Sequence, residues 1–235
     1  MLYRGQTLFS FVLSLSLSSF LLLMILKFYS DTQQKSYELF SLLKLQAEVQ
    51  QVVQLMAKDM RRAGFRKPLG NNSSNVDLFS IHIKQHLFLF KRSTQKEMSC
   101  ALFLYDADEN GCIGVRNESD QCKVSLQNRA NDIGRELFGY RLNGNMIETR
   151  DLRRTDVDKK CIGTACQQYL QEEACEKGRW VDLLDSDRIK FTRLNFQWLI
   201  ENKLLKIDVS AQLKKKNKVR YETSIIVPIM NNGGW

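Results

Sequence analysis

Proline and glycine are scarce in this sequence, and the stretch that lacks both marks its longest predicted element. The chain has 235 residues, with two prolines and 12 glycines. Neither residue type occurs between Gly5 and Gly64, and these are the residues that most strongly interrupt an α-helix. The sequence therefore permits one continuous helix of about 58 residues, roughly 87 Å long at the usual rise per residue.

Histidine is scarce as well, and the short motifs of common catalytic sites are missing. The chain has two histidines, no Cys-x-x-Cys pair, and no His-Glu-x-x-His, Gly-x-Ser-x-Gly or phosphate-binding glycine motif. Zinc coordination and thiol redox chemistry are therefore weak hypotheses. We expect that the protein is not an enzyme and has neither a cofactor nor a metal site. An enzyme is the third hypothesis, after the two given below.

An uncharged run follows a short basic leader at the N-terminus. From Leu8 to Leu26 this run is apolar except for serines. Its length of about 29 Å as a helix matches a hydrocarbon thickness of about 30 Å, so we expect it to cross a membrane. A cleaved secretory signal fits less well, because its apolar part is shorter and is followed by small residues, whereas Lys27 follows here. An uncleaved signal-anchor stays open.

Beyond Lys27 the apolar residues recur with the period of a helix. They lie three or four residues apart with one polar exception, which predicts an amphipathic helix. The positions are Leu39, Leu42, Gln46, Val49, Val53, Met56, Met60 and Ala63. We predict one long helix over residues 6–65, with its transmembrane part at 8–26. An anchor followed by a separate core helix, with a break near Tyr29–Gln34, is the alternative.

The rest of the chain, residues 66–235, shows the alternation that is typical of β-strands. The predicted strands cover residues 79–83, 138–142, 147–149, 194–200, 205–213 and 219–227. The last three are joined by short connections, which predicts an antiparallel meander. A sheet with one apolar face needs a cover, and the amphipathic helix is the expected cover. The predicted fold class is therefore α+β, with the long N-terminal helix packed on an antiparallel β-sheet head that has one core.

All cysteines lie in the predicted head. They are Cys100, Cys112, Cys122, Cys161, Cys166 and Cys175. An even number of cysteines in an exported segment predicts disulfides in an oxidising compartment. The sequence does not choose among the possible pairings. Cys161 and Cys166 are candidates to pair with each other or with Cys175.

Four short segments resemble members of one protein family. Arg4 and Gly5–Phe9, before the apolar helix, resemble a type IV prepilin signal. Asp59–Phe65, with the sequence Asp-Met-Arg-Arg-Ala-Gly-Phe, is similar to the helix end of minor pilins. Tyr105–Gly111 and Phe138–Leu142 resemble segments of the prepilin peptidase-dependent protein B group, which is related to the J-type minor pseudopilins of type II secretion. The resemblance implies a ladle-shaped, type IV pilin-like fold.

The resemblance also implies a processing site between Gly5 and Gln6. Prepilin peptidase would remove a leader of residues 1–5 on the cytoplasmic side, and Gln6 would become the methylated N-terminus. Gly5 suits this site because the enzyme needs close approach to the main chain. Arg4 suits it because a basic residue holds the leader in the cytoplasm.

Assembly into a fibre is the second implication. The freed helix would lie in the inner membrane through Leu8–Leu26, with a periplasmic head. Thr7, Leu8 and Ser10 would lie in the part of the helix that packs against other minor and major pilins. The expected partners are therefore prepilin peptidase, other pilins and the inner membrane, and the head would lie at or near the tip of the pilus or pseudopilus.

The sequence departs from the family pattern at two positions. The family usually has Phe or Met in place of Gln6 and Glu in place of Ser10. That Glu neutralises the terminal ammonium of a neighbouring subunit, because unpaired charge in lipid is costly, and Ser10 cannot do so. In the family a missing Glu goes with the subunit at the tip. Ser10 therefore indicates a tip or priming role, or it weakens the assignment, and whether Gln6 and Ser10 permit cleavage and polymerisation stays open.

Three further groups are candidate binding residues. Asp106–Gly111 has the opening spacing of a calcium loop, but Asn117 stands at the closing position, and a simple turn is the alternative. His82 and His86 are expected to be surface residues. The basic run Lys214–Arg220 could contact DNA phosphates or an acidic partner, and a solvated turn is the alternative.

Two functional hypotheses follow from the sequence. The first is a minor pilin or pseudopilin subunit that primes or caps assembly of a type IV pilus, a DNA-uptake pilus or a type II secretion pseudopilus, three systems that the sequence does not distinguish. The second is an uncleaved, signal-anchored periplasmic binding protein that contacts DNA or another anionic partner, to which a net charge of +9 is suited. The mature N-terminus separates the two hypotheses.

Overall fold

The computed structural model of the protein describes residues 4–67, 74–79, 85–116, 121–151, 161, 166, 168–184, 187–216 and 218–231. The side chains of residues 4–7 lie outside this description. The chain divides into two compact units, Met1–Lys44 and Leu45–Trp235. The division predicted from the sequence, into a leader, a long helix and a head, stays a prediction.

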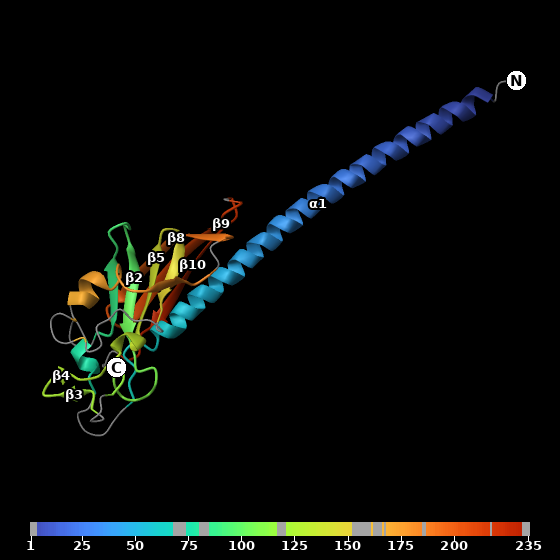
Figure 1. Ribbon diagram of the computed structural model, residues 1–235. Coiled ribbons are helices and arrows are strands. Elements are labelled where there is room, and N and C mark those ends of the chain that lie inside the picture. The colour runs from blue at the N-terminus through green and yellow to red at the C-terminus, as the bar shows by residue number, and fades with distance from the viewer. Residues whose placement is uncertain are drawn as a thin grey trace. The chain divides into compact units, whose positions relative to one another are not determined.

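Helix α1 (Arg4–Met60) is continuous over 57 residues (Figure 1). The predicted single helix is confirmed, and the alternative with a break near Tyr29–Gln34 is wrong. The serines in the apolar part do not interrupt the helix, because their hydroxyl groups donate to carbonyl oxygens one turn earlier. In Ser14, Ser16 and Ser18 these bonds are 2.7–2.9 Å long. Each of these hydroxyls therefore has a partner inside the helix, as a lipid environment requires.

The part of α1 that belongs to the second unit buries one face. Its buried residues are Leu45, Val49, Val52, Val53, Met56, Ala57 and Met60. They share a core with the β-strands of the head. The predicted stripe is right from Val49 onward, but its start is wrong, because Leu39 is 58% exposed and the residues of this core begin at Leu45.

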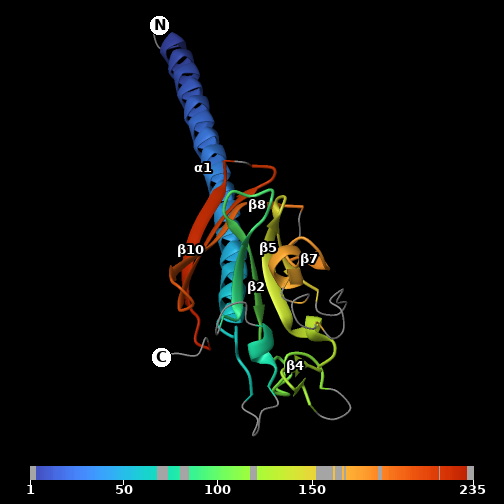
Figure 2. The same cartoon turned by 90° about the vertical axis from the view of Figure 1, so that its left-hand side faces the viewer.

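The larger of the two main sheets is antiparallel, with the strand order β1-β2-β5-β6-β7 (Figure 2). Its strands are β1 (Leu87–Lys91), β2 (Met98–Leu104), β5 (Leu137–Asn143), β6 (Met146–Arg150) and β7 (Trp180–Asp182). The predicted hairpin after Leu142 is confirmed, because Asn143 pairs with Met146 across a two-residue turn. The predicted strand over 79–83 lies mostly outside the described residues, and Phe79 ends a 3₁₀ helix, η1 (Val76–Phe79).

The smaller main sheet is the meander predicted near the C-terminus, with the order β10-β9-β8. Its strands are β8 (Ile189–Ile200), β9 (Leu204–Leu213) and β10 (Arg220–Pro228). Alternate residues of β8 and β9 are buried, and in the core they meet the buried face of α1. The α+β fold class is therefore confirmed. A separate two-stranded ribbon consists of β3 (Lys123–Val124) and β4 (Gln127–Asn128).

Both faces of the larger sheet are covered. On one face Ala101 and Phe103 pack in the core that contains α1 and the meander. On the other face Leu102 and Leu104 pack with η1 and with the helical turn η3 (Tyr169–Glu173). The expectation of one core is therefore incomplete, because the two sets of alternate residues in β2 are both apolar and form two cores.

All six cysteines form disulfides, which confirms the prediction that they pair. The pairs are Cys100–Cys175, Cys112–Cys122 and Cys161–Cys166. Of the two alternatives given for Cys161, pairing with Cys166 is right. Only one bridge is long-range: it joins β2 to the segment after η3, across a sequence separation of 75 residues.

Candidate functional site

The N-terminal part of α1 is one candidate site, because it exposes a long apolar surface. The helix is long and apolar enough to cross a membrane, and its most apolar stretch is not buried. Leu8 is 69% exposed and Leu26 is 55% exposed. An apolar surface of this size requires lipid or other helices around it.

The predicted processing residues lie at the beginning of this helix. The main chain of Arg4, Gly5, Gln6 and Thr7 is helical, and their side chains lie outside the described part. Ser10 is exposed. Cleavage between Gly5 and Gln6 therefore stays a prediction.

The other segments that carry the family resemblance meet at the C-terminal end of α1. The hydroxyl group of Tyr140 donates a hydrogen bond of 2.5 Å to the carboxylate of Asp59. The guanidinium carbon of Arg62 lies 5.9 Å from the ring centre of Tyr105, within the range of a cation–π interaction. Burial raises the pKa of Tyr140 above its usual value, and the bond to Asp59 raises it further, so this tyrosine stays a neutral donor.

An aromatic cluster lies next to this junction. The ring centres of Tyr105 and Phe138 are 4.1 Å apart, and Phe103 lies within 6.3 Å of Tyr105 and within 6.1 Å of Tyr140. Side chains from segments that are distant in sequence therefore pack together where α1 contacts the larger sheet. The residues that carry the family resemblance in these segments are therefore the ones that attach α1 to the head.

Gly64 lies in the turn that follows α1, in a left-handed conformation that favours glycine. Its φ is +76°, and its N–H group donates to the carbonyl oxygen of Leu104 at 2.8 Å. A Cβ at this position would lie 2.6 Å from Cδ2 of His86. His86 is 5% exposed, so the expectation that it is a surface residue is wrong, and His82 lies outside the described residues. Burial lowers the pKa of His86, which keeps the imidazole neutral in this contact.

Replacing Gly64 by alanine is expected to lower the free energy of unfolding of the head by about 2–3 kcal/mol. The new methyl group would meet the His86 ring and would also occupy an unfavourable φ. Gly144→Ala is the control, because Gly144 also has a positive φ, of +56°, but nothing lies within 4 Å of the added carbon. Urea unfolding of the detergent-solubilised chain should give a loss of only about 1 kcal/mol for the control. Equal losses would contradict the close contact with His86.

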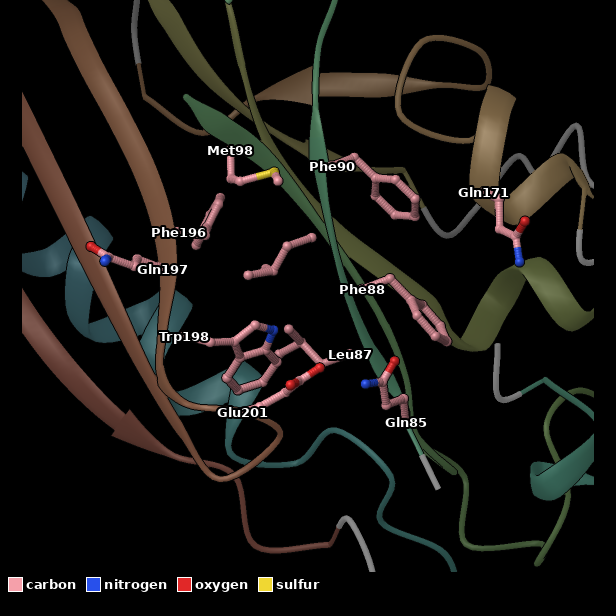
Figure 3. A pocket seen from close by; sticks show the side chains of 11 residues that line it. Gln85, Leu87, Phe88, Phe90, Met98, Gln171, Phe196, Gln197, Trp198 and Glu201 are labelled. Atoms are coloured by element: carbon pink, nitrogen blue, oxygen red, sulfur yellow. The ribbon is translucent and has the colours of Figure 1, made fainter. Parts of the chain in front are cut away.

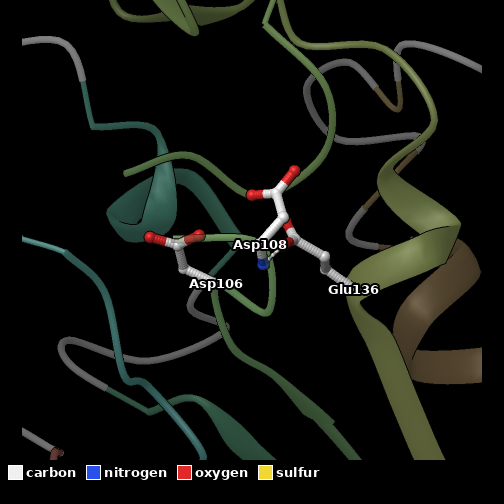
Figure 4. Close-up of side chains that lie close together, drawn as sticks. All are labelled: Asp106, Asp108 and Glu136. Carbon is white, nitrogen blue, oxygen red and sulfur yellow. Dashed lines mark hydrogen bonds between the residues drawn. The ribbon is translucent and has the colours of Figure 1, made fainter. Parts of the chain in front are cut away.

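Three carboxylates, Asp106, Asp108 and Glu136, form the second candidate site (Figure 4). Their potential ligand oxygens lie within 4.8 Å of one another. The groups around them are mainly N–H donors: Asp106 accepts bonds from the main chain of Lys67, Asn110 and Gly111 at 2.8–3.0 Å. This arrangement matches the turn predicted as the alternative to a calcium loop. A cation here would have to displace those donors.

Glu136 is the buried member of this cluster that the sequence did not reveal. Its carboxylate accepts hydrogen bonds from the main-chain N–H groups of Ala107, at 2.7 Å, and of Gly114. Burial and, to a smaller extent, the nearby Asp108 charge raise its pKa to about 7, although these hydrogen bonds lower it. Through the same hydrogen bonds the side chain links the loop between β2 and β3 to η2 (Ile133–Glu136).

The raised pKa of Glu136 predicts a pH-dependent stability. The folded head binds this proton more tightly than the unfolded chain does, so the contribution is complete below about pH 4.5 and is lost as the pH rises through about 7. The free energy of unfolding should therefore fall between these two values. Glu136→Gln should remove this part of the slope in urea unfolding followed across the window. An unchanged slope in the variant would contradict the assignment.

The basic run lies at the turn between β9 and β10. Lys214, Lys215 and Lys218 are exposed, and the main-chain N–H group of Lys214 donates to the carbonyl oxygen of Arg188 at 2.8 Å. Arg188 in turn lies 3.5 Å from the Glu48 carboxylate of α1. Exposed lysines fit both predicted alternatives, the solvated turn and contact with an anionic partner, and do not distinguish them. DNA binding by this surface stays a hypothesis.

An anchored α+β protein with a pilin-like arrangement is the class that the helix and the head define. Within that class, the model of the prepilin peptidase-dependent protein B family matches residues 38–229, and the chain belongs to this family. This confirms the resemblance that Asp59–Phe65, Tyr105–Gly111 and Phe138–Leu142 indicated, whereas Gly5–Phe9 lies outside the matched residues.

The chain is also similar to a curated relative. This is a Haemophilus influenzae protein described as uncharacterized, to which it is 38% identical over 192 residues, covering 80% of each chain. No solved structure matches the chain significantly.

Proposed function

We propose that this protein is a minor pilin or pseudopilin subunit that primes or caps the assembly of a type IV pilus, a DNA-uptake pilus or a type II secretion pseudopilus. The observation that carries the proposal is the exposed apolar surface of α1, on a helix that continues without a break into the core of the head. Family membership supports a link to prepilin peptidase. The proposal assigns the chain an assembly role and no catalytic one.

The proposed mechanism begins at the membrane. Prepilin peptidase cuts between Gly5 and Gln6, Gln6 is methylated, and the processed chain stays in the inner membrane through Leu8–Leu26. The three disulfides support a head in an oxidising compartment such as the periplasm. During assembly the apolar surface would leave the lipid and pack against the helices of other pilins, which replaces one apolar environment with another.

Ser10 supports a position at the tip. A subunit inside the fibre needs a carboxylate at this position to neutralise the N-terminus of a neighbour, since unpaired charge in an apolar environment is costly. A subunit with no neighbour beyond it has no such requirement. The hydroxyl of Ser10 carries no charge, which suits a subunit that starts or caps the fibre.

Counting fibres in a deletion strain tests the priming role. If the protein primes assembly, cells that lack it should make at least about tenfold fewer fibres, and those that form should have normal length. The full-length gene should restore the number, whereas a version with Leu17→Arg in the apolar run should not, because a charge at the centre of a span costs about 3 kcal/mol. Normal fibre numbers in the deletion strain would contradict the role and would favour an anchored binding protein.

A further inference from the structure

A groove lies between an edge strand of each main sheet (Figure 3). β1 is at the end of the larger sheet and β8 is at the end of the meander, so one edge of each is unpaired among the strands that the structure describes. Leu87–Phe90 of β1 and Phe196–Trp198 of β8 line the same groove. Its volume is about 470 Å³, within the range of about 300–1,000 Å³ that ligand sites occupy.

The lining residues show that the groove follows strand edges and not a sheet face. Successive side chains of a strand point to opposite faces of its sheet. A groove over one face would therefore be lined by alternate residues. Here the groove is lined by consecutive residues of each strand, Leu87–Phe90 and Phe196–Trp198. Its two walls therefore include the main-chain edges of both strands.

The hydrogen-bond pattern of β1 identifies the main-chain groups that face the groove. The N–H group of Leu104 in β2 donates to the carbonyl oxygen of His86 at 3.2 Å. Bonded and non-bonded pairs alternate along an antiparallel ladder, and His86 lies opposite Leu104 in this register. Phe88 and Phe90 therefore bond to β2, whereas the N–H and C=O groups of Leu87 and Leu89 point to the free edge.

The parts of these two edges that line the groove lack charged residues and proline, two of the features that usually prevent a strand from pairing. Natural edge strands are protected by charged residues, by proline or by short length. β7 has three residues, and β10 carries Arg220, Glu222 and Pro228. Neither Leu87–Phe90 nor Leu194–Ile200 contains a charged residue or a proline. β1 is short and ends in Lys91, and both strands have a bulge, so only the uncharged stretches along the groove are open to a further strand.

Charge restricts the kind of occupant. Among the residues that the structure describes, Glu201 is the charged one that lines the groove, and the others are aromatic, aliphatic, amide or thioether side chains. The groove therefore does not suit a nucleic acid or another anion, although the chain has a net charge of +9. An apolar segment with a lysine or arginine opposite Glu201 is complementary to it.

We propose that the groove binds an extended apolar segment of a neighbouring pilin-family subunit, which adds to β1 as a β-strand and places a basic residue at Glu201. Its main chain bonds to Leu87 and Leu89, and its side chains contact Met98 and Trp198. The inference rests on the proposed function, which supplies the neighbouring subunits.

Photo-crosslinking in cells that assemble the fibre tests this proposal. A benzophenone amino acid replaces Met98, which lines the groove and is 43% exposed, or Val181, which is 44% exposed at the opposite edge of the sheet. We expect a crosslink from position 98, and not from 181, to an apolar segment that contains a lysine or arginine in another membrane-anchored pilin-family protein. A crosslink to lipid, to a small molecule or to a second copy of this chain would overturn the proposal, as would equal crosslinking from both positions.

A charged residue in the groove provides the matched variant. Gln197→Lys introduces a protective charge at the edge of β8, and Thr192→Lys introduces the same charge at another exposed position of β8 outside the groove. Crosslinking from position 98 should fall at least about tenfold in the first variant and stay unchanged in the second. Equal crosslinking in both would overturn the proposal.

Hydrogen exchange distinguishes an added strand from side-chain contact alone. When a synthetic peptide with the crosslinked sequence binds the full chain, the amides of Leu87 and Leu89 should exchange at least about tenfold more slowly. Those of Phe88 and Phe90, which already bond to β2, should change little. Exchange at Leu87 and Leu89 that is unchanged on binding would overturn strand addition.

The mature N-terminus of the same cells separates this proposal from the function on which it rests. If Gly5–Gln6 is cut and no segment crosslinks to position 98, only the groove assignment fails. If the leader is retained, the proposed function fails whatever crosslinks are found.

Discussion

Replacing Cys100 and Cys175 together by alanine is expected to lower the free energy of unfolding of the head by about 4.5 kcal/mol. The bridge closes a loop across a sequence separation of 75 residues, and the loss of loop-closure entropy in the unfolded chain accounts for a value of this size. Removing Cys112 and Cys122, which are 10 residues apart, should cost less, about 2.7 kcal/mol by the same relation. Urea unfolding of the solubilised chain provides both values.

The long-range bridge has a second effect that the local one lacks. Cys175 lies at the end of a segment held by buried arginines: the Arg141 guanidinium donates to the carbonyl oxygen of Cys175 at 2.7 Å, and that of Arg150 donates to Ala174 at 3.0 Å. Arg92 forms an ion pair of 2.8 Å with Glu176. Without the bridge this segment should exchange its amide hydrogens faster. Equal losses of stability for both disulfides would contradict the long-range role.

Gly5→Leu is expected to reduce the processed fraction of the chain at least about tenfold. The proposed peptidase must approach the main chain closely at this bond, and a branched side chain blocks that approach. Gln6→Phe is the matched control, since it introduces a bulky residue on the other side of the same bond and restores the residue that the family usually has. The mobility of the chain in denaturing gels, with and without the peptidase, provides the measurement.

The two variants give opposite results if the processing site is assigned correctly. Gln6→Phe should be processed at least as well as the natural chain. Processing of Gly5→Leu at the normal level would show that the cut lies elsewhere or that the leader is not recognised through glycine.

Local sequence patterns predicted most of the fold. The absence of glycine and proline between Gly5 and Gly64 predicted α1 as one helix, because nothing in that stretch breaks a helical ladder. Alternation of apolar residues predicted the meander β8–β10, because one face of each strand is buried. Both patterns depend on neighbours in the sequence, which is why they could be found without the structure.

Features that depend on distant pairs could not be predicted in the same way. The partner of Cys100 is fixed only when β2 and the segment after η3 come together. His86 looked like a surface residue because nothing in the sequence connects it with Gly64, whose missing Cβ makes room for the imidazole. Glu136 likewise gave no signal, because its donors come from a loop more than about 20 residues away.

The candidate sites also differ in whether they depend on local sequence or on distant pairs. Gly5 and Gln6 were found through resemblance to a known signal, and the apolar run after them through composition. The groove between β1 and β8 could not be found from either source, because it exists only where the edges of two sheets lie side by side.

Intact mass and N-terminal sequencing of the membrane-extracted protein, with and without prepilin peptidase, test the proposed function most directly. The account predicts a chain that begins at Gln6, with the added mass of a methyl group, in cells that have the peptidase. In cells without the peptidase the chain should begin at Met1. A chain that keeps Met1–Gly5 in both cases would contradict the pilin assignment and leave an uncleaved, anchored binding protein as the better explanation.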